Sequence, residues 1–87
     1  MEIYVVMGTT GEYSDRSEWS VKAFSDEKKA KKFVREASKI AESIHAAAEY
    51  ADNKWLFRRE AKSPLDENFD IDYTGTSYFY YTVQLDD

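Results

Sequence analysis

Residues 25–62 decide the fold, and they read SDEKKAKKFVREASKIAESIHAAAEYADNKWLFRREAK. The stretch contains neither Gly nor Pro, and its apolar residues recur at alternating intervals of four and three positions. These residues are Ala30, Val34, Ala37, Ala41, Ile44, Ala48, Ala51 and Trp55. At about 100° per residue they fall on one face, so the spacing predicts one long amphipathic helix from about residue 26 to 61. A helix of this length spans roughly 50 Å, which is longer than a small domain is wide.

Three segments outside this stretch have strand character. Residues 2–7 (EIYVVM) are apolar on both faces, which favours a central strand. Residues 19–24 (WSVKAF) alternate, with Trp19, Val21 and Ala23 on one side. Residues 77–85 (SYFYYTVQL) are the most strand-like of the chain. For that last strand we expect a core face made of Phe79, Tyr81, Val83 and Leu85.

The predicted fold class is α+β, with a single domain over residues 1–87. Its order is ββαβ, and a three-stranded antiparallel sheet (order 2-1-3) packs on the one long helix. The helix must end before Pro64, because the residue preceding a proline is pushed out of the helical region. Beyond it, apolar and acidic residues alternate, which permits a short fourth strand near 69–73 with its carboxylates turned outward.

No motif for catalysis or for a cofactor is present. The chain lacks glycine-rich phosphate loops and zinc motifs, and it contains no Cys and one His, His45. Residues 66–70 (DENFD) begin like a calcium loop, but the glycine and the glutamate that such a loop requires are Ile71 and Ser77 here. We therefore expect no enzyme, no metal site and no cofactor.

The charge and hydropathy of the chain argue against several classes of partner and location. The formal net charge of −5 argues against nucleic acid and against anionic membranes. The first residues lack the basic and apolar regions of a signal peptide, and no apolar run is long enough to span a bilayer. The expected location is the cytoplasm.

One candidate partner-binding surface is a basic ridge on the first half of the helix, opposite its apolar face. The ridge consists of Lys28, Lys32, Arg35 and Lys39. It is either a solvated face that keeps the protein soluble or a docking strip for an acidic partner or a phosphate backbone.

A second candidate lies on the other half of the predicted helix. There Tyr50 and Phe57 form a second apolar face, opposite the one that Trp55 continues. One sheet cannot cover both faces. Either residues 65–73 fold back over the second face, or another chain covers it, for example in a homodimer.

The third candidate is the loop at residues 8–18, which is longer than a strand reversal requires. Tyr13 offers an amphipathic ring and Asp15 offers a carboxylate. Arg16 offers a planar guanidinium that can form two parallel hydrogen bonds with one partner group. The alternative is that these groups only stabilise the loop itself, with Arg16 paired to Glu12 or Glu18.

Three short motifs carry a resemblance to a known family. They are G-E-Y-S-D-R at 11–16, S-P-L-D at 63–66 and Y-T-G-T at 73–76, and a Tyr-rich strand follows them. The chain resembles a family of small uncharacterised proteins encoded by phages, prophages and bacteria. The resemblance implies a ββαβ fold and a viral or mobile-element origin, and it transfers no activity.

These observations together favour a non-enzymatic, small acidic protein-binding module. With the resemblance, the expected role is that of a phage- or prophage-encoded inhibitor or modulator of a host protein, such as an anti-defence (anti-CRISPR-like) protein in the host cytoplasm. The alternative is a nucleic-acid-binding accessory protein that uses the basic ridge.

Overall fold

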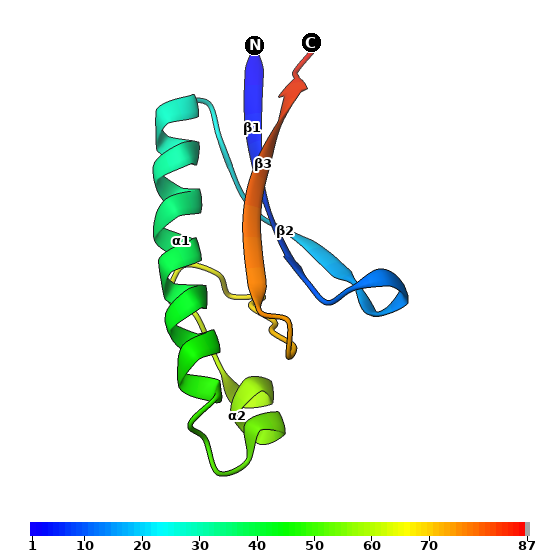
Figure 1. The fold of residues 1–87 in the computed structure, drawn as a ribbon. Helices are drawn as coiled ribbons and strands as arrows, with labels where there is room; N and C mark the ends of the chain where they lie inside the picture. The colour runs from blue at the N-terminus through cyan, green and yellow to red at the C-terminus, as the bar shows by residue number, and fades with distance from the viewer. Residues whose placement is uncertain (87) are drawn as a thin grey trace.

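The computed structural model describes residues 1–86 and confirms the α+β class. Three strands form one antiparallel sheet in the order β2-β1-β3, as predicted, and a long helix packs on it (Figure 1). The elements are β1 (Glu2–Thr10), a 3₁₀ turn η1 (Tyr13–Asp15), β2 (Ser17–Phe24), α1 (Glu27–Ala48), α2 (Lys54–Glu60) and β3 (Thr76–Gln84).

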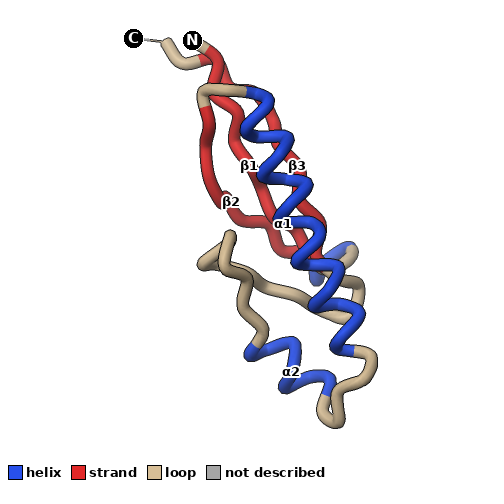
Figure 2. Tube along the Cα trace, turned by 90° about the vertical axis from the view of Figure 1, so that its left-hand side faces the viewer, coloured by secondary structure: helices blue, strands red, loops and turns tan. Residues whose placement is uncertain are grey.

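The molecule has two layers over most of its length. Helix α1 covers one face of the sheet, and none of the described elements covers the other (Figures 1 and 2). The last turns of α1 run past the end of the sheet, where α2 and the loop that follows it fold beneath them. The structure is accordingly elongated, with extents of 51 × 26 × 16 Å.

Small side chains let α1 lie close to the sheet. The four buried residues of α1 are all alanines, each at most 1% exposed: Ala30, Ala37, Ala41 and Ala48. Three of them, Ala30, Ala37 and Ala41, form one buried cluster with Val6 and Tyr78 of the sheet, and Phe24, Phe33 and Val34 pack around it. Among the described residues, Val6 is the one large side chain that is fully buried. The core is therefore thin and sensitive to the spacing between helix and sheet.

The first half of the predicted long helix is present, but the prediction that it continues unbroken to about residue 61 is wrong. Helix α1 ends at Ala48, and α2 begins only at Lys54. The break has a local cause, since the Asn53 side chain accepts a hydrogen bond of 3.0 Å from the backbone N–H of Leu56 and so caps a new helix. Asp26, next to the expected start, caps α1 in the same way by accepting from the Lys28 N–H.

The predicted fourth strand is also wrong, because residues 69–73 form an irregular loop. Side chains and backbone hold it against the end of β1. The Thr10 hydroxyl donates to the Gly75 carbonyl over 2.6 Å and accepts from the Asp72 N–H over 3.0 Å. Partial burial acts to raise the pKa of Asp72, but hydrogen bonds from Thr74 and Thr10 outweigh it, so this pKa lies below its ordinary value.

The loop also adds apolar side chains beneath the helix. Leu65 and Phe69 pack against the core cluster, and Ile71 is only 5% exposed. The chain therefore folds back under the overhanging end of α1, but it does not cover Tyr50 of the predicted second face, which is 91% exposed.

Candidate functional site

The uncovered side of the sheet is apolar. In antiparallel strands, directly paired residues lie on the same face, and the register pairs Met7 with Phe79, Val5 with Tyr81, and Ile3 with Val83. Alternate residues of β1 and β3, which include Val6 and Tyr78, face α1 instead. We call the uncovered side the open face and define it by eight residues that the register places there: Ile3, Val5, Met7, Ser20, Ala23, Phe79, Tyr81 and Val83.

The side chains at one edge of the open face are well exposed. Tyr81 is 46% exposed, Val83 40% and Phe79 37%. The sequence places these residues, with Leu85, in the core, so the predicted orientation of β3 is wrong. The side chains that face α1 are those of Tyr78 and Tyr80.

Tyrosine suits the covered face, which is the side of the sheet that packs against α1. Its ring can be buried there while its hydroxyl binds a polar group at the edge. The Tyr78 hydroxyl donates to the carboxylate of Asp66 over 2.7 Å, and the Tyr80 hydroxyl donates to Glu27 over 3.1 Å. Burial, followed by the hydrogen bond to Asp66, raises the pKa of Tyr78, so this hydroxyl stays protonated and donates at neutral pH.

A bulge in β2 supplies the small side chain of the open face. The pairing shifts between Val6, opposite Lys22, and Met7, opposite Ser20, which leaves Val21 as the extra residue. Val21 then packs in the core, whereas Ala23 pairs with Val5 on the open face. The simple alternation predicted for β2 is therefore wrong.

One buried carboxylate ties the covered side together. Asp66 is 3% exposed, and its Oδ2 accepts hydrogen bonds from the Trp19 indole over 2.9 Å and from the Tyr78 hydroxyl over 2.7 Å. Its Oδ1 accepts from the backbone N–H of Asn68 over 3.1 Å. Trp19 lies against Gly8, where an added Cβ would come within 2.6 Å of the indole ring. Asp66 thus joins the loop to both outer strands.

The turn between β1 and β2 projects away from α1, on the side of the open face (Figure 1). Tyr13 at this turn is 94% exposed and has a φ of 53°, in the left-handed region. Arg16 pairs with Glu18 at 2.7 Å and donates to the Thr9 hydroxyl over 3.3 Å, as the internal alternative predicts. Asp15 is exposed and its backbone N–H donates to the Glu12 carbonyl.

The left-handed backbone makes Tyr13 a costly residue at this position. Asn tolerates this conformation better than an aromatic residue does, and the ring of Tyr13 is almost wholly in solvent. We expect Tyr13→Asn to raise the free energy of unfolding by about 0.5–1 kcal/mol and the melting temperature by roughly 2–8 °C. Ser14→Asn, next to it, is the control and should change neither. A lower melting temperature for Tyr13→Asn would show that the ring stabilises the turn.

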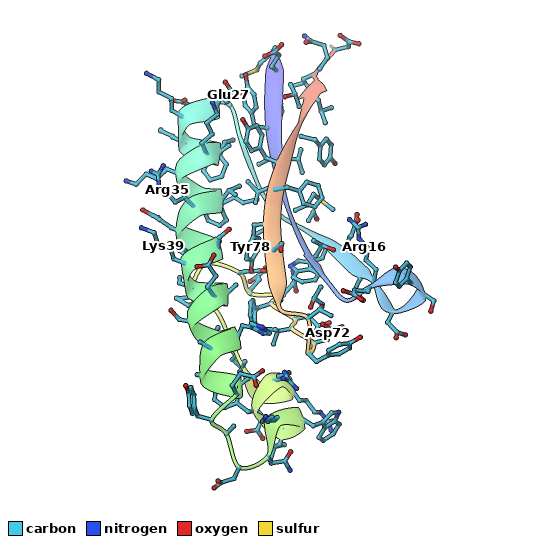
Figure 3. The ribbon with its side chains drawn as sticks, in the orientation of Figure 1. Arg16, Glu27, Arg35, Lys39, Asp72 and Tyr78 are labelled. Carbon is cyan, nitrogen blue, oxygen red and sulfur yellow. The ribbon has the colours of Figure 1, made fainter. Side chains whose placement is uncertain are left out.

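The basic ridge is where the helical spacing predicts it. Lys28, Lys32, Arg35 and Lys39 are all exposed. Arg35 and Lys39 point away from the sheet, on the opposite side of the molecule from Arg16 (Figure 3). Lys32 makes only a long ion pair of 4.0 Å with Glu36.

Tyr50 and Phe57 do not share a helix face, because the break separates them. Tyr50 lies in the turn after α1 and is 91% exposed, whereas Phe57 lies in α2 and is half-buried. The premise of a dimer through one continuous helix face is therefore wrong.

Near these residues, Trp55, Arg58, Arg59 and Tyr73 border a shallow hollow of about 370 Å³ together with Asp70 and Asp72. Its lining mixes both signs of charge and indicates no single kind of ligand.

Within residues 1–86, no three His, Asp or Glu side chains lie close enough to hold a metal ion, and no helix is both long and apolar enough to cross a bilayer. Comparisons with protein-family models, with curated proteins and with solved structures found no match. The open face is thus the feature that sequence reasoning missed and that the fold makes most prominent.

Proposed function

We propose that the protein is a non-enzymatic protein-binding module and that the open face is its contact surface. The observation that carries the proposal is the apolar, uncovered side of the sheet, on which Phe79, Tyr81 and Val83 are each more than a third exposed. Contiguous exposed apolar patches on a soluble domain usually mark interaction sites. The inhibitor and anti-defence roles rest on the resemblance to phage and prophage proteins and stay predictions. The cytoplasmic location rests on charge and hydropathy and is also a prediction.

The size of the open face suits a small protein interface. Strands of nine residues are about 30 Å long, and three of them spaced about 4.8 Å apart make a face of roughly 400 Å² in projection. Side-chain relief raises the accessible area above this value. Each partner in a specific interface contributes about 800 Å², so the open face supplies a substantial part of one.

The chemistry of the open face favours protein over nucleic acid. None of its eight residues is charged, and β3 contains no charged residue. At the turn end, the register adds the acidic Glu18, opposite Thr9, on the same side. A phosphate backbone needs Lys or Arg at the contact. The four cations of the basic ridge lie on α1, away from the open face, and Arg16, at the turn on the side of the open face, is already paired with Glu18. Tyrosine and methionine are enriched where proteins meet.

A single-cysteine experiment tests the proposal, because the natural chain contains no cysteine. Val83→Cys places a thiol on the open face, and Thr82→Cys places one on the neighbouring residue, which is also exposed but lies on the opposite side of β3. We expect dilute purified chains to react with a maleimide at similar rates at both positions. In intact cells of the source organism, position 83 should react at least 5-fold more slowly than position 82.

The same pair of variants is then labelled as purified protein over a range of concentrations. Protection of position 83 in cells or at high concentration supports the open face as a contact surface. Equal reactivity of the two positions under every condition would overturn the proposal.

A further inference from the structure

We infer that the open face binds a second copy of this chain, face to face, about a two-fold axis parallel to the strands. The inference rests on the proposed function and names the partner. The resulting dimer has four layers, with the two sheets inside and the two α1 helices outside.

Side chains become smaller across the middle of the open face, from β3 through β1 to β2. The pairing sets Tyr81, Val5 and Ala23 in one row across the three strands, and Phe79, Met7 and Ser20 in the next. Each row runs from an aromatic residue at β3, through an aliphatic residue or methionine at β1, to a small residue at β2. In these two central rows the face is therefore thick at β3 and thin at β2, whereas the row at the turn end, Ser77, Thr9 and Glu18, has its longest side chain at β2.

A complementary surface must be thin where this face is thick. The same chain provides that surface when it is turned about an axis parallel to its strands, because the turn exchanges the left and right edges of each row. Tyr81 of one copy then lies over Ala23 of the other, Phe79 lies over Ser20, and Val5 lies over Val5. Sheets that pack face to face lie about 10 Å apart with their strands nearly aligned, which keeps these rows in contact.

The edge of β3 offers a different way to pair, and the position of α1 opposes it. Helix α1 packs chiefly against β3, and its lower half extends toward the edge of the sheet (Figure 2). Two β3 strands paired edge to edge lie only about 4.8 Å apart, which brings the two α1 helices into the same space. In the face-to-face arrangement the two α1 helices lie on opposite outer sides, and the β1–β2 turn of each copy, which projects on the side of the open face (Figure 1), lies at the β3 edge of the other copy.

Area and charge set the strength of the dimer. Two open faces bury about 800–1,200 Å² in total, below the roughly 1,200–2,000 Å² of stable specific interfaces, so we expect a weak dimer that forms only at micromolar concentrations or above. Each copy carries a net charge of −5, and the two copies repel. Salt screens this repulsion, so raising NaCl from 50 to 500 mM should lower the Kd about 2- to 5-fold. If the basic ridge of one copy bound acidic residues of another, salt would screen that attraction and raise the Kd instead.

Sedimentation equilibrium of the full chain from 5 to 500 µM tests the inference. We expect a monomer–dimer equilibrium. Tyr81→Ala leaves a void over Ala23 of the other copy, and Ala23→Leu puts bulk against bulk. Each should raise the Kd at least 10-fold. The double variant, Ala23→Leu with Tyr81→Ala, reverses the gradient and should return the Kd to within about 3-fold of the natural chain.

Circular dichroism shows whether each variant is folded, and Ala46→Leu, exposed on α1, is the control that should leave the Kd unchanged. A chain that stays monomeric at 500 µM overturns the inference. A dimer in which the double variant is weaker than both single variants overturns the proposed axis. Monomeric chain with position 83 still protected in cells would reject the second copy but keep the proposed function, with a different protein as partner.

Discussion

Asp66→Ala is expected to lower the free energy of unfolding by about 3–5 kcal/mol. The change removes a buried carboxylate and leaves the Trp19 indole N–H and the Tyr78 hydroxyl, 2.9 and 2.7 Å from it, without their acceptor. Each buried donor left unpaired costs about 1–3 kcal/mol. A domain of this size has only about 4–13 kcal/mol of stability in total, so the variant should melt at least about 12 °C lower.

Glu67→Ala is the matched control, because Glu67 is the neighbouring acidic residue and is exposed. It should stay within about 0.5 kcal/mol of the natural chain. Asp66→Asn keeps one acceptor oxygen, so its free energy of unfolding should lie between those of Asp66→Ala and Glu67→Ala. An Asp66→Ala variant that melts within a few degrees of the natural protein would contradict the view that this carboxylate joins the loop to both outer strands.

Ala37→Leu is expected to cost about 2–3 kcal/mol by overpacking. Ala37 lies on the side of α1 that packs against the sheet and is fully buried. The three carbons that leucine adds must push the helix away from β3 or force strained rotamers. Urea denaturation at 25 °C measures the change. Ala47→Leu, exposed on the same helix, should change the stability by less than about 0.5 kcal/mol. Equal effects of the two substitutions would show that the helix is not held close by its alanines.

The sequence was sufficient to predict the order of the strands. Residues 2–7 are apolar on both faces, which is why β1 takes the centre of the sheet. The basic ridge also followed from helical spacing, since Arg35 and Lys39 lie four residues apart. The end of the long helix was not predicted, because the alanine spacing continues through Ala51 and hides the capping signal of Asp52-Asn53. Asn53, directly before Lys54, is a typical helix-capping residue, but the regular spacing of the alanines favoured the prediction of one unbroken helix.

The orientation of β3 could not be predicted from hydropathy. Phe79 and Val83 are more apolar than Tyr78 and Tyr80, and a transfer scale therefore assigns them to the core. The hydrogen bonds of Tyr78 and Tyr80 to Asp66 and Glu27 reverse this preference, and those acceptors are far away in sequence. One signal was available. Both β1 and β3 are apolar on two faces, and a chain with one long helix can cover only one of them.

If the proposed function is right, the open face is covered by protein in the cell. The most direct test is the maleimide reactivity of Val83→Cys divided by that of Thr82→Cys, measured in intact cells of the source organism and again on dilute purified chain. We predict that this ratio falls at least 5-fold in the cells, because a protein partner covers one side of β3 and leaves the other in solvent. A ratio that is the same in cells as in dilute solution, and that stays the same up to 500 µM purified chain, would contradict the account.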